Sequence, residues 1–176
     1  LPGVGEINRV HKELKDRVSA VVLPLHGRLP PKEQDRVFAH VDQTKVILAT
    51  NIAETSITID GIRWVIDSGL ARRPIFDSAV GLERLETVRI SASSADQRAG
   101  RAGRTGAGHC VRLWSQAKQQ SLSAQHPPEI SHLDLSNALL QVRAWGSTPE
   151  QFGWYETPPP DGVSRAINLL TALDAL

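Results

Sequence analysis

Residues 45–69 read KVILATNIAETSITIDGIRWVIDSG, and two short apolar runs in this stretch decide the expected fold. The runs at 45–49 and 62–66 are short and rich in β-branched residues, so each predicts a buried strand. The second run ends at Asp67-Ser68-Gly69, whose residues are typical of turns. The stretch therefore predicts two sheet strands that follow one another along the chain.

Similar signals extend toward the amino terminus. Apolar residues recur with helical spacing over 7–14, and 20–25 is another short β-branched run. Pro30-Pro31 opens a further helix, expected to reach residue 41, because proline is tolerated in the first helical turn. Helices that alternate with strands are typical of a parallel sheet wrapped by helices, so we expect an α/β fold.

Toward the carboxyl terminus the pattern changes. Residues 72–77 and 82–90 are two extended stretches around residues 78–81, which end in glycine, and this predicts a protruding β-hairpin. A two-stranded ribbon is marginal in water, so we expect it to pack on something outside this chain. A helix over 94–103, begun by serine caps, and a strand over 109–114 are expected next.

From about residue 118 the chain becomes helical and proline-bearing. Two amphipathic helices are expected, over 133–142 and 163–176, with proline-containing links before each. We therefore predict an α/β domain over 1–117 and a short α-helical segment over 118–176.

Composition narrows the class of protein. Of the 176 residues 40% are apolar and 22% charged, as in ordinary globular proteins. No apolar run approaches the roughly 18–20 residues that span a bilayer, so no membrane partner is expected. Cys110 is the only cysteine, which excludes an intrachain disulfide and fits a reducing, cytoplasmic location. The histidines show no metal-ligand spacing. Without methionine, and opening at Leu1-Pro2-Gly3, the chain is expected to be a piece of a longer protein.

Charge is unevenly distributed. Residues 1–117 carry 17 basic and 13 acidic side chains, whereas 118–176 carry 3 and 6. Arginine outnumbers lysine 15 to 5, and arginine binds phosphate in a bidentate way that lysine cannot. A phosphate-bearing partner and an arginine-favouring codon usage explain this bias equally well.

The strongest motif is QRAGRAGR at 97–104. On a helix Arg101 and Arg104 share a face at spacing i,i+3, and Gln97 lies one turn before Arg101. Such a face suits the γ-phosphate of a nucleotide. The alternative is a solvated basic helix, but each interior glycine costs about 1 kcal/mol, and two of them call for a compensating reason.

QRAGRAGR resembles motif VI of the DEAH-box helicases, superfamily 2 proteins that move along RNA using ATP. Residues 49–61 are similar to motif V of that family, 1–6 to the end of motif IV and 23–31 to the next conserved block. The HrpB group of bacteria is the most similar. The resemblance implies a second RecA-like domain over 1–117, followed by the start of a winged-helix domain.

The resemblance also implies which parts of the motor are elsewhere. The sequence contains no Gly-Lys and no Asp-Glu dipeptide, and therefore neither a P-loop nor a DEAH box. In this family both belong to the first RecA-like domain, and ATP binds between the two domains. We expect that domain to supply the Mg²⁺ ligands, and this chain alone to be inactive as an ATPase.

Roles at the nucleotide follow from the same match. Gln97, Arg101 and Arg104 resemble the catalytic residues that face ATP, the two arginines as arginine fingers. Thr58 and Asp60 resemble residues near the nucleotide, and Phe38 resembles the aromatic residue that stacks on adenine. The candidate nucleotide-site residues are thus Gln97, Arg101, Arg104, Phe38, Thr58 and Asp60. The alternatives are a turn-forming role for Asp60 and core packing for Phe38.

Contacts to single-stranded RNA are implied for Thr50 and Asn51, which follow a strand at the place where open α/β sheets bind ligands. Arg28 is a further candidate for a phosphate contact. Contacts of this kind position a strand without reading its sequence. Besides an ATP-dependent helicase motor, two alternatives stay open: a non-catalytic RNA-binding module from a degenerate relative, and a related DNA helicase.

Overall fold

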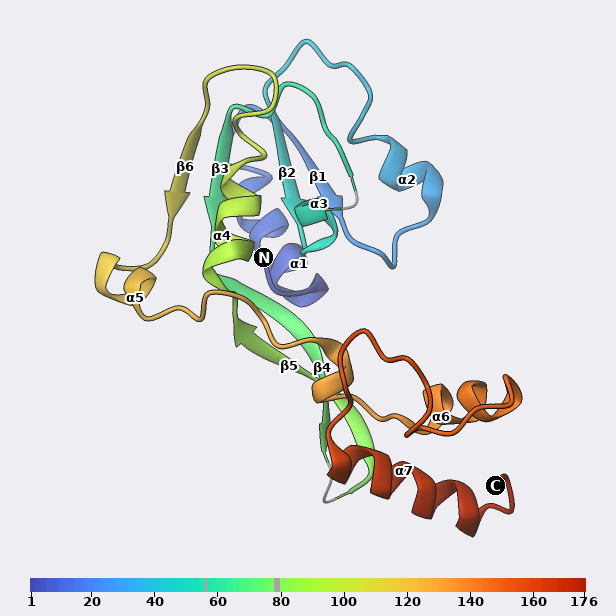
Figure 1. Ribbon diagram of the computed structural model, residues 1–176. Coiled ribbons are helices and arrows are strands. Elements are labelled where there is room, and N and C mark those ends of the chain that lie inside the picture. The colour runs from blue at the N-terminus through green and yellow to red at the C-terminus, as the bar shows by residue number, and fades with distance from the viewer. Residues whose placement is uncertain (56, 78–79) are drawn as a thin grey trace. The chain divides into compact units, whose positions relative to one another are not determined.

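The computed structural model describes residues 1–55, 57–77 and 80–176 (Figure 1). The chain divides into two compact units. The first contains Leu1–Arg72 and Thr87–His126, and the second contains Arg73–Glu86 and Pro127–Leu176. The domain boundary expected at residue 117 stays a prediction.

Parallel strand pairs form the centre of the first unit. Strand β1 (Val21–Leu25) pairs with β2 (Lys45–Ala49), and β3 (Trp64–Asp67) pairs with β6 (His109–Arg112). All four strands run in the same direction, so their carboxyl ends lie at one edge (Figure 1). The predicted α/β fold with a parallel sheet is confirmed, and each predicted strand is present.

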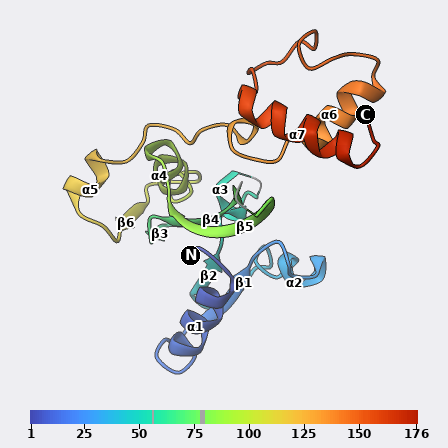
Figure 2. The same cartoon turned by 90° about the horizontal axis from the view of Figure 1, so that it is seen from below.

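Helices cover both sides of these strands. Helix α1 (Val4–Leu14) lies on one side, and α3 (Ile52–Thr55) and α4 (Ala92–Ala99) lie on the other (Figure 2). Helix α1 places Ile7 against the strands, fully buried. The helices α3 and α5 (Gln116–Gln120) were not expected from the sequence.

The apolar core of this unit comes from the strands and the segments that follow them. Leu23, Leu25 and Val37 are buried together, and the half-buried side chains around them come mostly from 47–59. A second cluster joins Ala71 and Ile90 to helix α4. The strand runs are thus buried as their apolar composition predicts.

Two predicted helices are shorter in the structure. Helix α2 spans Pro31–Asp35 instead of reaching residue 41, because the carbonyls of Val37 and Ala39 accept hydrogen bonds from Lys45 Nζ at 2.8 and 2.7 Å. Helix α4 ends at Ala99 and is capped by Gly100. The expected helix over 94–103 is therefore wrong in its last turn, where glycine is unfavourable in a helix interior.

The predicted hairpin is present as β4 (Leu70–Asp77) and β5 (Leu82–Arg89), which pair with one another. Residues 78–79, part of its expected turn, lie outside the described residues. Residues 73–86 group with the carboxyl-terminal helices, and the Arg165 guanidinium lies 5.9 Å from the centre of the Phe76 ring. The hairpin thus has a contact within the chain, while Leu82 and Leu85 of β5 are 67% and 66% exposed, and the expectation that it packs on something outside the chain stays a prediction.

The rest of the second unit is helical. A short 3₁₀ turn (Glu129–Ser131) precedes α6 (Ser136–Ala144) and α7 (Pro160–Ala172). The two helices bury a small core of Leu135, Leu139, Ala166 and Leu170. This confirms the short helical segment of the predicted fold, and its assignment to a winged-helix domain stays a prediction. No helix in the described ranges is both long and apolar enough to cross a bilayer.

Candidate functional site

Two arginines link the turn after α4 to the loop after α3. Arg101 Nη1 donates to the Ile57 carbonyl at 2.7 Å, and its Nη2 donates to the Glu54 carbonyl. Arg104 Nη1 donates to the hydroxyl of Thr58. The structure thus brings together three of the residues singled out in the sequence, although the segments that carry them are more than 40 positions apart.

The two arginines lie outside the helix on which the sequence argument placed them. Helix α4 has ended, and residues 100–103 form turns in which Arg101, Ala102 and Gly103 each donate a backbone hydrogen bond three residues back. The shared helix face expected for Arg101 and Arg104 was therefore wrong. Their proximity comes from a tight turn that directs both side chains toward the same loop.

Gly108 is required for this turn to fold back. A Cβ atom at this position would lie 2.0 Å from the carbonyl oxygen of Ala102. No side chain fits in that space, so only glycine allows the chain leaving the turn to pass directly beside it before β6 begins.

The electrostatic environment of the turn favours an anion. Burial, followed by the nearby charge of Arg104, lowers the pKa of Arg101 below its usual value, whereas Glu54 acts in the opposite direction. Arginine remains protonated in proteins because its intrinsic pKa is so high. Two neighbouring cations that oppose one another would both be stabilised by an anion placed between them.

A buried ion-pair network lies directly beneath the turn. Arg98 Nε lies 2.9 Å from Glu54 Oε2, and its Nη1 lies 2.9 Å from Asp67 Oδ1 and 3.2 Å from the Leu70 carbonyl. Glu54 also accepts a hydrogen bond from the Ser94 hydroxyl at 2.6 Å. The network joins α3, α4 and the end of β3, and therefore fixes the motif V segment against the motif VI segment.

Sequence reasoning missed this network. Arg98 and Glu54 both lie in the motifs that were quoted, but they are 44 residues apart and nothing in the spacing pairs them. The one available signal is that Ser94 and Arg98 are i,i+4 on a helix. This spacing predicts that they share a helix face, but it does not predict which residues contact that face.

The structure does not join the other three predicted nucleotide residues to the arginine cluster. Gln97 is exposed on α4, one turn before Arg101. Asp60 is exposed beside Gly61, whose φ of +76° is a turn conformation. Phe38 is 50% exposed and lies in the turn after α2. The exposed ring argues against the alternative of core packing, a role taken by the fully buried Val37.

The predicted RNA-contacting residues follow the strands β1 and β2. Arg28 is exposed in the turn after β1, and Asn51 is exposed directly after β2. Thr50 donates its backbone N–H to the Leu25 carbonyl at 3.1 Å, which holds the two strand ends together. These residues therefore lie at the carboxyl edge of the sheet, as the sequence argument expected.

No group of three or more metal-ligating side chains occurs within residues 1–55, 57–77 and 80–176. Cys110 lies in β6, where burial raises the pKa of its thiol above the usual value. The chemistry available at this site is therefore that of guanidinium groups, hydroxyls and amides, which suits the binding of phosphate oxygens.

Comparisons with known proteins agree with this geometry. Residues 4–106 match the helicase conserved C-terminal domain family. The chain is 45% identical over its whole length to the ATP-dependent RNA helicase HrpB of Escherichia coli, and it covers 22% of that protein. It is 42% identical over its whole length to human DHX34, a probable ATP-dependent RNA helicase of which it covers 16%.

Solved structures give the same result for the fold. The crystal structure of the Escherichia coli DEAH/RHA helicase HrpB superimposes with a TM-score of 0.93 at 44% identity, over the whole chain and 23% of that structure. The chain thus spans less than a quarter of the length of these relatives. The resemblance seen in the sequence is confirmed, and the chain belongs to the helicase conserved C-terminal domain family.

Proposed function

We propose that this chain is the second RecA-like motor domain, with the start of a winged-helix domain, of an ATP-dependent DEAH-box RNA helicase of the HrpB type. The observation that carries the proposal is the cluster of Arg101, Arg104 and Thr58. Two guanidinium groups meet there on one partly open surface. Relatives that match the whole chain are ATP-dependent RNA helicases, which supports the same assignment.

The arginine cluster fits the terminal phosphate of ATP. Arg101 and Arg104 would donate to the γ-phosphate from the side opposite the first RecA-like domain, and bound ATP supplies the bond that is hydrolysed. Their charges stabilise the negative charge that develops during phosphoryl transfer, an effect of about 10³–10⁵ in rate for an arginine finger. Gln97, one turn earlier on α4, would orient the attacking water.

The remaining nucleotide residues have positioning roles in this proposal. Phe38 would stack on the adenine base, Asp60 would bind the ribose hydroxyls and Thr58 would lie near the phosphates. The carbonyl contacts of Lys45 hold the turn that exposes Phe38. The Mg²⁺ ligands would come from the first RecA-like domain, as the resemblance to the DEAH-box family implies.

The carboxyl edge of the sheet is the proposed RNA surface. Thr50 and Asn51 would hydrogen-bond to the backbone of single-stranded RNA, and Arg28 would bind a phosphate. Such contacts hold a strand without reading bases. The partners are then single-stranded RNA and the first RecA-like domain. A cytoplasmic location is proposed from the single cysteine.

The test is ATP hydrolysis by the full-length protein, measured with and without single-stranded RNA. Hydrolysis that RNA stimulates is expected. A full-length protein that binds RNA but has no ATPase activity would instead support the non-catalytic binding module.

The isolated chain provides a second prediction. Residues 1–176 should show no ATP turnover, because both the P-loop and the DEAH box are absent from this sequence. Turnover that copurifies with the chain through successive columns, and is abolished by Arg104→Ala, would contradict the two-domain assignment.

A further inference from the structure

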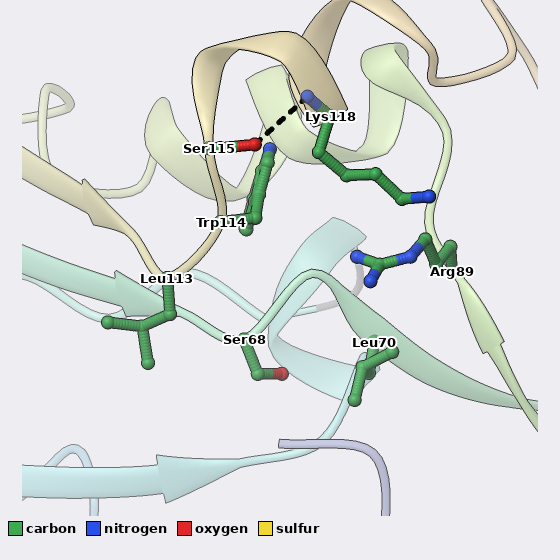
Figure 3. Close-up of a pocket in the computed structure, with 7 residues that line it drawn as sticks. All are labelled: Ser68, Leu70, Arg89, Leu113, Trp114, Ser115 and Lys118. Atoms are coloured by element: carbon green, nitrogen blue, oxygen red, sulfur yellow. Dashed lines mark hydrogen bonds between the residues drawn. The ribbon is translucent and has the colours of Figure 1, made fainter.

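A polar pocket lies in the first unit, lined by residues other than those of the arginine cluster. It is an open hollow of about 510 Å³, and its lining includes Ser68, Arg89, Leu113, Trp114 and Lys118 (Figure 3). None of these residues belongs to the proposed ATP site or to the proposed RNA contacts. The pocket therefore needs an explanation of its own.

The fold places the pocket at the ends of two parallel strands. Ser68 directly follows β3, and Leu113 and Trp114 directly follow β6. Arg89 is the last residue of β5, where the hairpin returns to the first unit, and Lys118 lies on α5. The pocket thus lies at the same carboxyl edge of the strands as the proposed RNA contacts (Figure 1).

Close packing fixes one wall of the pocket. Gly69 has a φ of +71°, and a Cβ atom there would lie 2.8 Å from the ring of Trp114. The indole Nε1 of Trp114 donates to Gln119 Oε1 at 2.9 Å. The indole is therefore held against the backbone on one side and tied to α5 on the other, and this positions the helix that carries Lys118.

The charges in the pocket are of one sign. In Figure 3 the side chains of Arg89 and Lys118 reach into the pocket from opposite sides, and no carboxylate lines the pocket. In the described part of the chain neither side chain forms an ion pair. The nearest carboxylate along the chain, Asp67, is buried and bound to Arg98. Two cations in one pocket that has no counter-charge are stabilised by an anion.

The charged groups of the lining are the ones open to a ligand. Arg89 and Lys118 are both exposed, whereas the hydroxyl of Ser68 is buried and has no hydrogen-bond partner among the described residues. Arginine and lysine are side chains that bind phosphate oxygens of nucleic acids. The arginine fork can donate two parallel hydrogen bonds to phosphate oxygens, which suits a phosphodiester.

We propose that Arg89 and Lys118 bind a backbone phosphate of the RNA strand, beyond the contacts proposed for Thr50 and Asn51. This inference rests on the proposed function, since it requires that RNA binds this edge of the sheet. The parallel β-strands bring the proposed RNA contacts of Thr50 and Asn51 and the pocket to one edge of the sheet. An RNA strand that runs along this edge therefore passes the ends of β1 and β2 first and then the base of the hairpin. The pocket extends the RNA surface in that direction.

The experiment measures binding of a labelled single-stranded RNA to the full-length protein at several salt concentrations. The variant Arg89→Gln/Lys118→Gln should bind about tenfold or more weakly at low salt. The slope of log affinity against log salt should become shallower by about 0.7 for each phosphate that the variant no longer neutralises. The matched control is Lys12→Gln/Lys15→Gln, which removes two exposed charges at the far end of α1 and should leave the slope unchanged.

Two further measurements separate the removal of a phosphate-binding charge from damage to the fold. The conservative variant Arg89→Lys/Lys118→Arg keeps both charges and should retain most of the affinity. A single neutral methylphosphonate linkage, moved along the RNA strand, should weaken binding to the unaltered protein at one position. At that position it should have no effect on binding to Arg89→Gln/Lys118→Gln.

The outcomes distinguish the pocket from the wider proposal. If the unaltered protein fails to bind RNA, both the proposed function and this inference are overturned. If it binds RNA but Arg89→Gln/Lys118→Gln retains its affinity and salt slope, only the pocket assignment is overturned, and the pocket is then free for a different acidic partner.

Discussion

Arg98 and Arg104 lie six residues apart in one motif, yet they differ in burial and in their hydrogen-bond partners. The Arg98 side chain is 12% exposed and bound to two carboxylates, whereas Arg104 is exposed and bound to one hydroxyl. A buried charge with two partners cannot leave them for a ligand without a large penalty. An exposed charge with one neutral partner can leave that partner for a ligand without such a penalty. The motif thus contains an arginine that holds the fold, Arg98, and one that is available to a phosphate, Arg104. Arg101 is intermediate, because it is half-buried and donates to two neutral backbone carbonyls.

The largest effect is expected at Arg101 and Arg104, the two proposed arginine fingers. In the full-length protein, Arg101→Ala or Arg104→Ala should lower kcat for RNA-stimulated ATP hydrolysis by about 10³-fold or more, because the charge that stabilises phosphoryl transfer is removed. RNA affinity without nucleotide should change little. Wild-type turnover by either variant would remove that arginine from the catalytic role.

The next effect is expected at the buried arginine. Arg98→Ala leaves Glu54 and Asp67 buried without their counter-charge, and this should destabilise the domain by about 3–5 kcal/mol. Hydrogen exchange of the backbone in β3 and β6 would report the destabilisation, since both strands adjoin the network. Arg104→Ala is the matched control and should leave exchange in these strands almost unchanged. Equal protection in the two variants would show that Arg98 does not hold the fold.

A smaller effect tests the turn that separates the two kinds of arginine. Gly108→Ala forces a Cβ atom against the Ala102 carbonyl and should destabilise the domain by about 1–3 kcal/mol. Gly106→Ala is the matched control, because a Cβ there meets no atom within 4 Å. Thermal denaturation should show a lower Tm for Gly108→Ala alone. Similar values for both variants would mean that the loop relaxes without strain.

The sequence predicts the strands well and the helix ends poorly, for a physical reason. The apolar run at 45–49 has clear ends, and strand β2 begins and ends at the residues predicted from it. The end of α4 depends on whether Gly100 continues the helix or caps it. The i,i+3 spacing of Arg101 and Arg104 favoured a continued helix, so the cap at Gly100 was not predicted. Sequence spacing describes a helix face only where the helix exists.

The candidate site shows a similar limit. Arg101, Arg104 and Thr58 could be named from the motifs, since the motifs carry them directly. The partners of Arg98 could not, because Glu54 and Asp67 reach it only after three separate segments have packed. The pocket of Arg89 and Lys118 was missed for the same reason, since its residues come from the ends of several strands and from α5.

The parallel pairing of β3 with β6 also has a consequence for the order of folding. Trp64 lies beside His109, so this pair closes a loop of 45 residues that contains the hairpin and α4. Closing so long a loop lowers chain entropy before any contact compensates for it, and contacts between distant residues slow folding. Helices α6 and α7 are linked by a much shorter segment, and we expect them to associate earlier. The arginine network and the turn above it would then be assembled last, which makes the proposed ATP-facing surface the latest part of the chain to become native.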